Sequence, residues 1–265
     1  MPLPSHDHDR NLSRAFDGQA AQFERAPVQS DPHALDRLVR FANLPADALV
    51  FDAGCGPGLV AEALLKADLR VFGVDLSQEM VERARKRCGR FGDRARFQQG
   101  SLFDPFPLGG FDASISRYVI HHVPDPVAFV ARQAELVRGG GVVIACDHTT
   151  DPDSQAAEWH LAIERARDTT HTRNLTPGEI VDVFARAGLD EIATLEDTFI
   201  LDFDEWFDRG TPGESKQQVR ERLVSGTQAR GYTVTRRDGG GLTIDCRRSL
   251  VRGVVPSVGR PSAAK

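Results

Sequence analysis

Glycines and a carboxylate stand close together where the first apolar run of the chain ends. Residues 49–58 read Leu-Val-Phe-Asp-Ala-Gly-Cys-Gly-Pro-Gly, and the apolar-rich segment 59–65 follows directly. An apolar run that stops at closely spaced glycines and continues into a second apolar segment is typical of a buried strand, a tight turn and a helix. Glycine permits the unusual dihedrals of such a turn, and it lets a ligand lie against the backbone near the free N–H groups of the helix start.

A second carboxylate follows the next apolar run. Residues 70–74 are mostly apolar and lead into Asp75, which lies 21 residues after Gly54. An acid about 20 residues beyond a glycine turn can accept hydrogen bonds from both ribose hydroxyls of a nucleoside. The glycine spacing differs from the G-x-G-x-x-G form, because the third glycine comes two residues after the second. This difference disfavours a dinucleotide.

Histidines supply the candidate acid–base chemistry. His121, His122, His148 and His171 are expected near the carboxyl ends of strands or in a covering loop, and histidine is the side chain best suited to accept a proton near neutral pH. Adjacent residues point in different directions, so His121 and His122 cannot serve one pocket equally. We expect His122 or His171 to be the catalytic base, with a packing or hydrogen-bonding role as the alternative for each. No metal-ligand spacing and no G-x-S-x-G elbow is present, so we expect no metal site.

The periodicity of apolar residues predicts an α/β fold, a single Rossmann-like doubly wound sheet. The sheet is expected to be mostly parallel, with helices on its faces and an antiparallel C-terminal hairpin strand. After the glycine-motif strand, further strands are expected over 70–74, 95–99, 110–116, 142–146, 189–201 and 242–250. Helices are expected from Asp31, 59 and Ser77, and over 126–138, 151–167, 176–187, 203–209 and 214–225.

We expect one domain over residues 1–265, with no internal repeat. An N-terminal cap is expected over 11–30, and an inserted helix with a cover loop over 151–176. Residues 1–10 and 253–265 are expected to be loose tails.

The motif Asp52-x-Gly54-x-Gly56-x-Gly58, together with Asp75, resembles the class I S-adenosylmethionine-dependent methyltransferases. The segment 111–126 and the run Glu164-x-x-Arg-Asp-x-x-His-x-Arg173 are similar to the small-molecule branch of that family, which includes the quinone-biosynthesis methyltransferases. The resemblance implies S-adenosyl-L-methionine as cofactor and S-adenosyl-L-homocysteine as product. It implies a cofactor site made of Asp52, Gly54, Cys55, Gly56, Gly58, Asp75, Leu76, Ser101, Leu102 and Arg117.

For Ser101 and Arg117 the resemblance also implies which part of the cofactor each residue would contact. Family members commonly have an acid that approaches the adenine amino group where this chain has Ser101, so the adenine contact is less firmly implied than the ribose contact. Arg117 is expected beside the methionine part of the cofactor. The run 164–173 is expected either to face the active site or to act as a salt-bridged brace.

Composition limits the classes of partner. The hydrophobic content of 40% and charged content of 27% are ordinary for a globular protein. A net charge of −5 argues against a nucleic-acid partner bound by a broad cationic face. The four cysteines form no C-x-x-C pair, and no apolar leader or membrane-length stretch is present. We therefore expect a cytoplasmic protein without membrane insertion, and we leave the oligomeric state open, a homodimer being one option.

The sequence thus predicts methyl transfer to a small, partly apolar metabolite. Three alternatives stay open at this stage. The first is an S-adenosylmethionine-binding enzyme that catalyses a rearrangement or cyclisation, and the second is a nicotinamide-dependent oxidoreductase. The third is a non-catalytic protein that keeps the fold.

Overall fold

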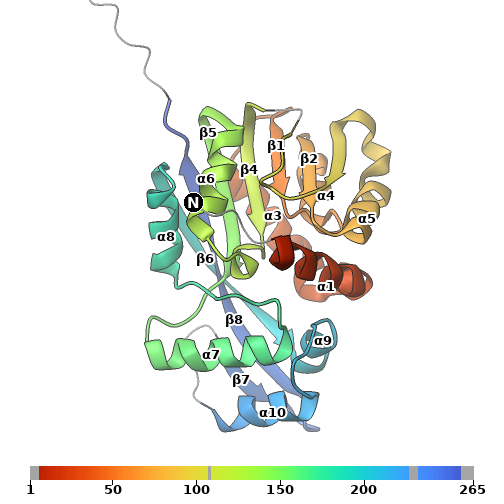
Figure 1. Cartoon of the computed structure of the whole chain (residues 1–265), viewed down its shortest axis with the longest axis vertical. Helices are drawn as coiled ribbons and strands as arrows, with labels where there is room; N and C mark the ends of the chain where they lie inside the picture. The colour runs from red at the N-terminus through yellow and green to blue at the C-terminus, as the bar shows by residue number, and fades with distance from the viewer. Residues whose placement is uncertain (1–5, 107–108, 227–231, 258–265) are drawn as a thin grey trace, which may run out of the picture.

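A mixed β-sheet runs the length of the protein (Figure 1). The structure is a computed structural model, and it describes residues 6–106, 109–226 and 232–257. Within these residues the strand order is β3-β2-β1-β4-β5-β8-β6, and β7 pairs with β8 beside this path. The strands are β1 (Leu49–Ala53), β2 (Arg70–Asp75), β3 (Ala95–Gln99), β4 (Phe111–Arg117), β5 (Val137–His148), β6 (Asp190–Asp202), β7 (Tyr232–Arg236) and β8 (Leu242–Val254).

The first five strands are parallel, and β8 is antiparallel to its neighbours β5, β6 and β7. The expected Rossmann-like sheet with an antiparallel C-terminal hairpin strand is confirmed. The hairpin consists of β7 and β8, joined by the glycine-rich turn 237–241.

Helices cover both faces of the parallel part. The helices of the described residues are α1 (His6–Arg25), α2 (Pro27–Ser30), α3 (Pro32–Ala42), α4 (Leu59–Lys66), α5 (Gln78–Cys88), α6 (Pro126–Leu136), α7 (Ser154–Arg167), α8 (Pro177–Arg186), α9 (Phe203–Asp208) and α10 (Lys216–Ser225), with short 3₁₀ turns at Gly89–Arg94 and Ile120–His122. One apolar cluster joins α3, α4 and α5 to the sheet, and a second joins α6 and α8. Side chains cap these helices at the expected residues, among them Asp31, Ser77 and Thr176.

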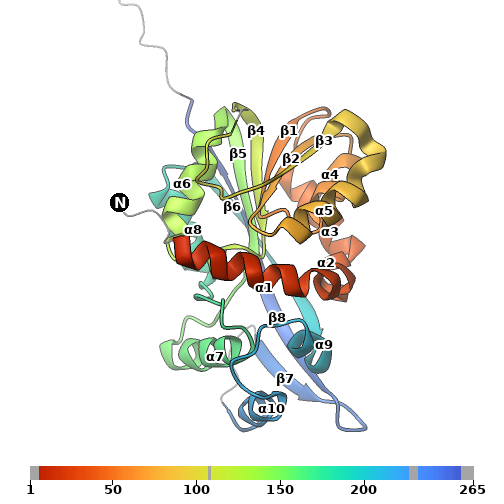
Figure 2. The same cartoon turned by 45° about the vertical axis from the view of Figure 1, so that its right-hand side comes forward.

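The distal part of the sheet carries its own small core. The first half of β8 pairs with β6 and β7, and its second half pairs with β6 and β5. Helices α7, α9 and α10 pack on the distal half, around Trp206 and Tyr232. We propose that the chain is one domain, because β8 belongs to both halves of the sheet. Figure 2 shows α1 lying across the protein between these halves.

Several boundaries differ from expectation. Residues 6–10 are not a loose tail, because α1 begins at His6; residues 1–5 lie outside the described residues. Gly253 and Val254 extend β8 by pairing with β5, while 258–265 lie outside the description. The helix expected over 126–138 ends at Leu136, because the β-branched Val137 pairs with Phe111 and begins β5. Strand β7 was not expected.

Candidate active site

The turn after β1 takes the shape that its glycines allow. Gly54, Gly56 and Gly58 all have positive φ, at 77°, 51° and 80°. A Cβ on Gly54 would lie 2.7 Å from a methyl carbon of Val119, and one on Gly58 would lie 2.9 Å from the Cα of Ala84 on α5. Gly54 and Gly56 line a pocket at the carboxyl edge of the sheet. Gly58 instead allows α4 and α5 to approach each other.

Asp75 lies at the end of β2 and lines the same pocket, called here the outer pocket. Its Oδ2 accepts a hydrogen bond from the N–H of Gly56 at 2.8 Å, and its Oδ1 accepts one from the N–H of Ser77 at 2.9 Å. Burial raises the pKa of Asp75 to about 6, although both N–H groups act to lower it. Each carboxylate oxygen keeps a lone pair that can accept a ribose hydroxyl.

The outer pocket has a cavity volume of about 140 Å³. Leu76, Ser101 and Leu102 line it from the ends of β2 and β3. Helix α1 covers it with His8, Asp9, Leu12, Phe16 and Phe23. The first turn of α1 thus forms part of the pocket wall.

Two predicted cofactor residues lie beneath the pocket, outside its lining. Cys55 points into the core, and its N–H donates to the carbonyl of Val74. Asp52 is 1% exposed, and its Oδ2 has no hydrogen-bond partner. Burial, and then the neighbouring Asp75, raise the pKa of Asp52 to about 7. A buried carboxylate without a partner fits a ligand that brings a cation, as S-adenosylmethionine does.

Arg117 is the last residue of β4, and its side chain forms hydrogen bonds to the short helix α2. Its guanidinium donates to the carbonyls of Val28 and Gln29 at 2.9 and 2.8 Å. Tyr118 follows in the left-handed region, with φ of 59°, and its hydroxyl accepts a hydrogen bond from Arg248. Both residues line the outer pocket.

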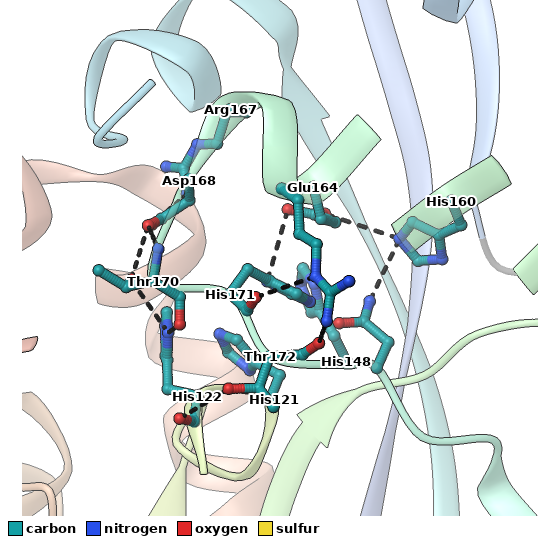
Figure 3. A network of polar contacts seen from close by, with 12 residues as sticks. His121, His122, His148, His160, Glu164, Arg167, Asp168, Thr170, His171 and Thr172 are labelled. Carbon is teal, nitrogen blue, oxygen red and sulfur yellow. Dashed lines mark hydrogen bonds and ion pairs between the residues drawn. The ribbon is translucent and has the colours of Figure 1, made fainter. Parts of the chain in front are cut away.

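A second cavity, called here the inner cavity, adjoins the outer pocket. Its volume is about 40 Å³, enough for a few water molecules. Phe16, Phe23, Tyr118 and His122 line both spaces. The remaining walls are Val28, Gln29, His121, His148, Glu164, Arg167, Asp168, His171, Trp206 and Arg209. Figure 3 shows how the histidines gather between α7 and the ends of β4 and β5.

His121 and Asp147 form a buried dyad. The Nδ1 of His121 lies 2.6 Å from Oδ1 of Asp147, and the His121 ring stacks on His171 with centroids 5.0 Å apart. Burial alone would lower the pKa of His121, but the carboxylate of Asp147 raises it above the ordinary value. The same pairing lowers the pKa of Asp147 against the effect of its burial. His121 therefore carries positive charge to a higher pH than a free histidine.

His122 is held in the opposite protonation state. Its Nδ1 lies 3.1 Å from the carbonyl oxygen of Thr170, so that nitrogen must carry the proton and donate it. Burial, and then the charge of His121, lower the pKa of His122 to about 4. The ring is neutral at physiological pH, and its Nε2 has a free lone pair to accept a proton.

His171 lines the inner cavity beside His121. Its Nε2 is buried without a hydrogen-bond partner, and its Nδ1 is 3.9 Å from Oε2 of Glu164, too far for a hydrogen bond. Burial lowers the pKa of His171 well below its ordinary value. Burial would raise the pKa of Glu164, but His160 and His171 lower it overall. The buried Glu164 therefore carries negative charge beside a neutral His171.

The run 164–173 makes contacts of both kinds that were expected of it, cavity lining and ion pairs. Arg167, Asp168 and His171 line the inner cavity, with Arg167 and Asp168 paired at 3.2 Å. Arg173 instead pairs with Glu179 on α8 at 3.0 Å, on the surface. One end of the run lines the inner cavity, and the other forms an ion pair at the surface.

Sequence reasoning missed part of this site. Asp147 and Arg209 were not expected to contribute, and His121 was not the first choice of base. Asp147 lies near the carboxyl end of β5, beside the end of β4, and it directly follows the apolar run 142–146, which is a usable signal. Nothing local to Arg209 indicates that it reaches the inner cavity.

Among the described residues, no group of three or more His, Cys, Asp or Glu side chains could hold a metal ion. No described helix is long and apolar enough to cross a membrane.

Comparisons with known proteins identify the family. Residues 51–145 match the model of a methyltransferase domain. The ubiquinone biosynthesis O-methyltransferase of Aromatoleum aromaticum is 31% identical over 169 residues, which span 60% of this chain and 71% of that protein. The chain belongs to the S-adenosylmethionine-dependent methyltransferases. This methyltransferase uses S-adenosylmethionine as its methyl donor, and its relatives give no support to the alternatives of an oxidoreductase or a rearrangement enzyme.

Other relatives agree with this assignment. The methyltransferase YcgJ of Bacillus subtilis is 28% identical over 211 residues, which span 78% of this chain and 83% of that protein. Its crystal structure superposes with a TM-score of 0.76 over 86% of this chain and 99% of the other. A putative methyltransferase of Bacillus halodurans shares the fold, with a TM-score of 0.73 at 23% identity over 84% of this chain and 99% of the other.

Proposed function

We propose that this methyltransferase holds S-adenosylmethionine in the outer pocket and methylates a small molecule in the inner cavity. The observation that carries the proposal is the shared wall of the two spaces, because Phe16, Phe23, Tyr118 and His122 line both. A cofactor in the outer pocket and an acceptor in the inner cavity would both contact these four side chains, so the two molecules would lie next to each other. Positioning of this kind can supply roughly 7–11 kcal/mol of the barrier.

The cofactor residues are proposed as follows. Asp75 accepts the ribose hydroxyls, and the backbone of Gly54 and Gly56 lies against the nucleoside. Leu76, Ser101 and Leu102 enclose the base. Asp52 and Arg117 complement the charges of the methionine part, and Cys55 and Gly58 keep the turn in shape. When bound, S-adenosylmethionine supplies an electrophilic methyl group on a sulfonium.

His122 is the proposed base for an acceptor hydroxyl or amine. It is neutral, lines both spaces, and has its Nε2 available. The positive charge on the neighbouring His121 stabilises an acceptor oxygen as it loses its proton. His171 is the second candidate, because its buried Nε2 has no partner. The name of the Aromatoleum relative, an O-methyltransferase, favours an oxygen acceptor.

The remaining parts of the proposal concern partners and location. The acceptor is a small molecule and not a nucleic acid, since the net charge of the chain is −5. The cytoplasm is the proposed location, supported by four buried free cysteines.

The experiment follows a radiolabelled methyl group from S-adenosylmethionine into the small-molecule, protein and nucleic-acid fractions of a cell extract. We expect label in the small-molecule fraction. His122→Gln should lower kcat by about 10²–10⁴-fold while leaving S-adenosylmethionine affinity unchanged. His33→Gln, at an exposed site on α3, is the matched control. Label only in protein or nucleic acid would refute a small-molecule acceptor, and an unchanged kcat would refute the base.

A further inference from the structure

Two buried guanidinium groups face the inner cavity with unused N–H groups. Arg167, at the end of α7, is 7% exposed. Its Nε donates to the carbonyl of Trp206 at 2.9 Å, its Nη1 contacts Asp168, and its Nη2 has no partner. Arg209, after α9, is 6% exposed, and its Nε lies 3.0 Å from Glu205 without hydrogen-bond geometry. Buried donors normally have acceptors, so Nη2 of Arg167 indicates a ligand acceptor in this cavity. Arg209, which is ion-paired with Glu205, lines the same cavity and adds a second positive charge.

The two groups are held in place against their mutual repulsion. Burial, and then the charge of Arg167, lower the pKa of Arg209 to about 10. Aromatic rings support both guanidiniums: Cζ of Arg167 lies 5.2 Å from the ring centre of Trp206, and Cζ of Arg209 lies 5.8 Å from that of Phe23. Rings in these positions favour cations and restrict their movement. The guanidiniums are therefore preorganised for an anion.

Two other lining residues of the cavity, Glu164 and His171, have side-chain atoms of complementary chemistry. Oε1 of Glu164 and Nε2 of His171 are buried with no hydrogen-bond partner, although Oε1 of Glu164 lies 3.6 Å from Nε2 of His160. A carboxylate oxygen only accepts hydrogen bonds, so a ligand that binds Oε1 of Glu164 must supply a donor such as a hydroxyl or an amine. The lining of the cavity thus includes both donors and acceptors that lack a hydrogen bond, around a volume of about 40 Å³.

We propose that the inner cavity binds a hydroxy- or aminocarboxylate group, which is the polar end of the methyl acceptor, while the atom to be methylated lies toward His122. Arg167 and Arg209 receive the carboxylate, and Glu164 and His171 receive the hydroxyl or amine. A carboxylate suits the site because it is planar and carries two oxygens, one for each guanidinium. The inference rests on the proposed function, and it makes the acceptor more polar than the partly apolar metabolite expected from the sequence.

The test uses the fluorescence of Trp206, which lines the inner cavity. The chain has two tryptophans, so Trp159→Phe leaves Trp206 as the only reporter. The Trp159→Phe variant is titrated with glycolate, with glycolamide, which is the neutral isostere of glycolate, and with inorganic phosphate. Each titration is run with and without saturating S-adenosylhomocysteine, whose own binding is measured first by calorimetry on the same sample.

We expect saturable binding of glycolate, at least tenfold tighter than binding of glycolamide or phosphate. Arg167→Gln and Arg209→Gln should each weaken glycolate binding at least tenfold, whereas S-adenosylhomocysteine affinity stays unchanged. Arg222→Gln, at a surface ion pair on α10, is the matched control. Arg167→Lys keeps the charge beside Asp168, so it provides a folded variant that lacks the planar guanidinium.

Three results would overturn the inference. They are no saturable change with glycolate, equal binding of glycolamide, and tighter binding of phosphate. S-adenosylhomocysteine binding without glycolate binding would refute the carboxylate site alone. Glycolate binding without S-adenosylhomocysteine binding would refute the cofactor assignment and leave the carboxylate site standing.

Discussion

Replacing Asp52 by asparagine should stabilise the protein without cofactor. The Asp52 carboxylate is buried with an unpartnered Oδ2, and burial raises its pKa from 3.8 to about 7. That difference corresponds to about 4 kcal/mol of folding free energy lost when the group ionises. The asparagine amide also loses some hydration on burial, so we expect a gain of about 2–4 kcal/mol above pH 7.

The direction of the pH dependence follows from the raised pKa. Between about pH 4 and pH 7 folded Asp52 keeps its proton while the unfolded chain releases it, so the stability of the wild type falls as pH rises through this window. The variant lacks this contribution. Asp75, whose pKa is raised to about 6, adds a dependence of the same sign in both proteins.

The assay is thermal unfolding of the wild type and Asp52→Asn at pH 4 and pH 8. At pH 8 the variant should melt about 4–16 °C higher, since 1 kcal/mol shifts Tm by about 2–4 °C in a domain of this size. At pH 4 the two should melt within about 2 °C of each other. The variant should bind S-adenosylmethionine about tenfold more weakly, since it loses a charge-assisted contact. If Asp52→Asn melts at a lower temperature than the wild type at pH 8, then Asp52 is not a buried carboxylate without a stabilising partner.

Three further predictions concern other parts of the site. Asp75→Ala should weaken S-adenosylmethionine binding by about 1.5–3 kcal/mol in calorimetry, because it removes a charge-assisted acceptor; unchanged affinity would reject the ribose contact. Asp147→Asn should lower the pKa of His121, so kcat should begin to fall at a lower pH on the alkaline side of its pH profile. An unshifted profile would show that the charge on His121 does not contribute to kcat. Gly58→Ala should lower stability by about 1–3 kcal/mol more than Gly239→Ala, since both glycines have positive φ but a Cβ has room only at Gly239; equal melting curves would contradict the close packing of α4 on α5.

The parts of the fold with strong local signals were predictable from sequence. Strand β3 has the bounds that its composition predicts, and Thr176 and Glu179 form the expected capping box. Gly54 and Asp75 lie together because each ends one of two neighbouring parallel strands. In each case the information lies within a few residues, or in the general rule that parallel strands end at one edge.

The inner cavity was not predictable, because its walls come from distant segments. Phe16, Tyr118, Glu164 and Arg209 lie far apart in the chain and meet only after β6, β7 and β8 build the distal core. Single histidines could be singled out, but the pairing of His121 with a residue on the next strand depends on register. Unpartnered atoms such as Nη2 of Arg167 exist only as a property of the packed structure.

The most direct test of the central claim is calorimetric titration with S-adenosylmethionine, S-adenosylhomocysteine and NAD in turn. The wild type should bind both sulfur nucleosides and not NAD. Gly54→Val should bind none of the three, because its side chain would meet Val119 at the wall of the outer pocket. Binding of NAD, or sulfur-nucleoside binding that survives Gly54→Val, would contradict the placement of the cofactor in the outer pocket.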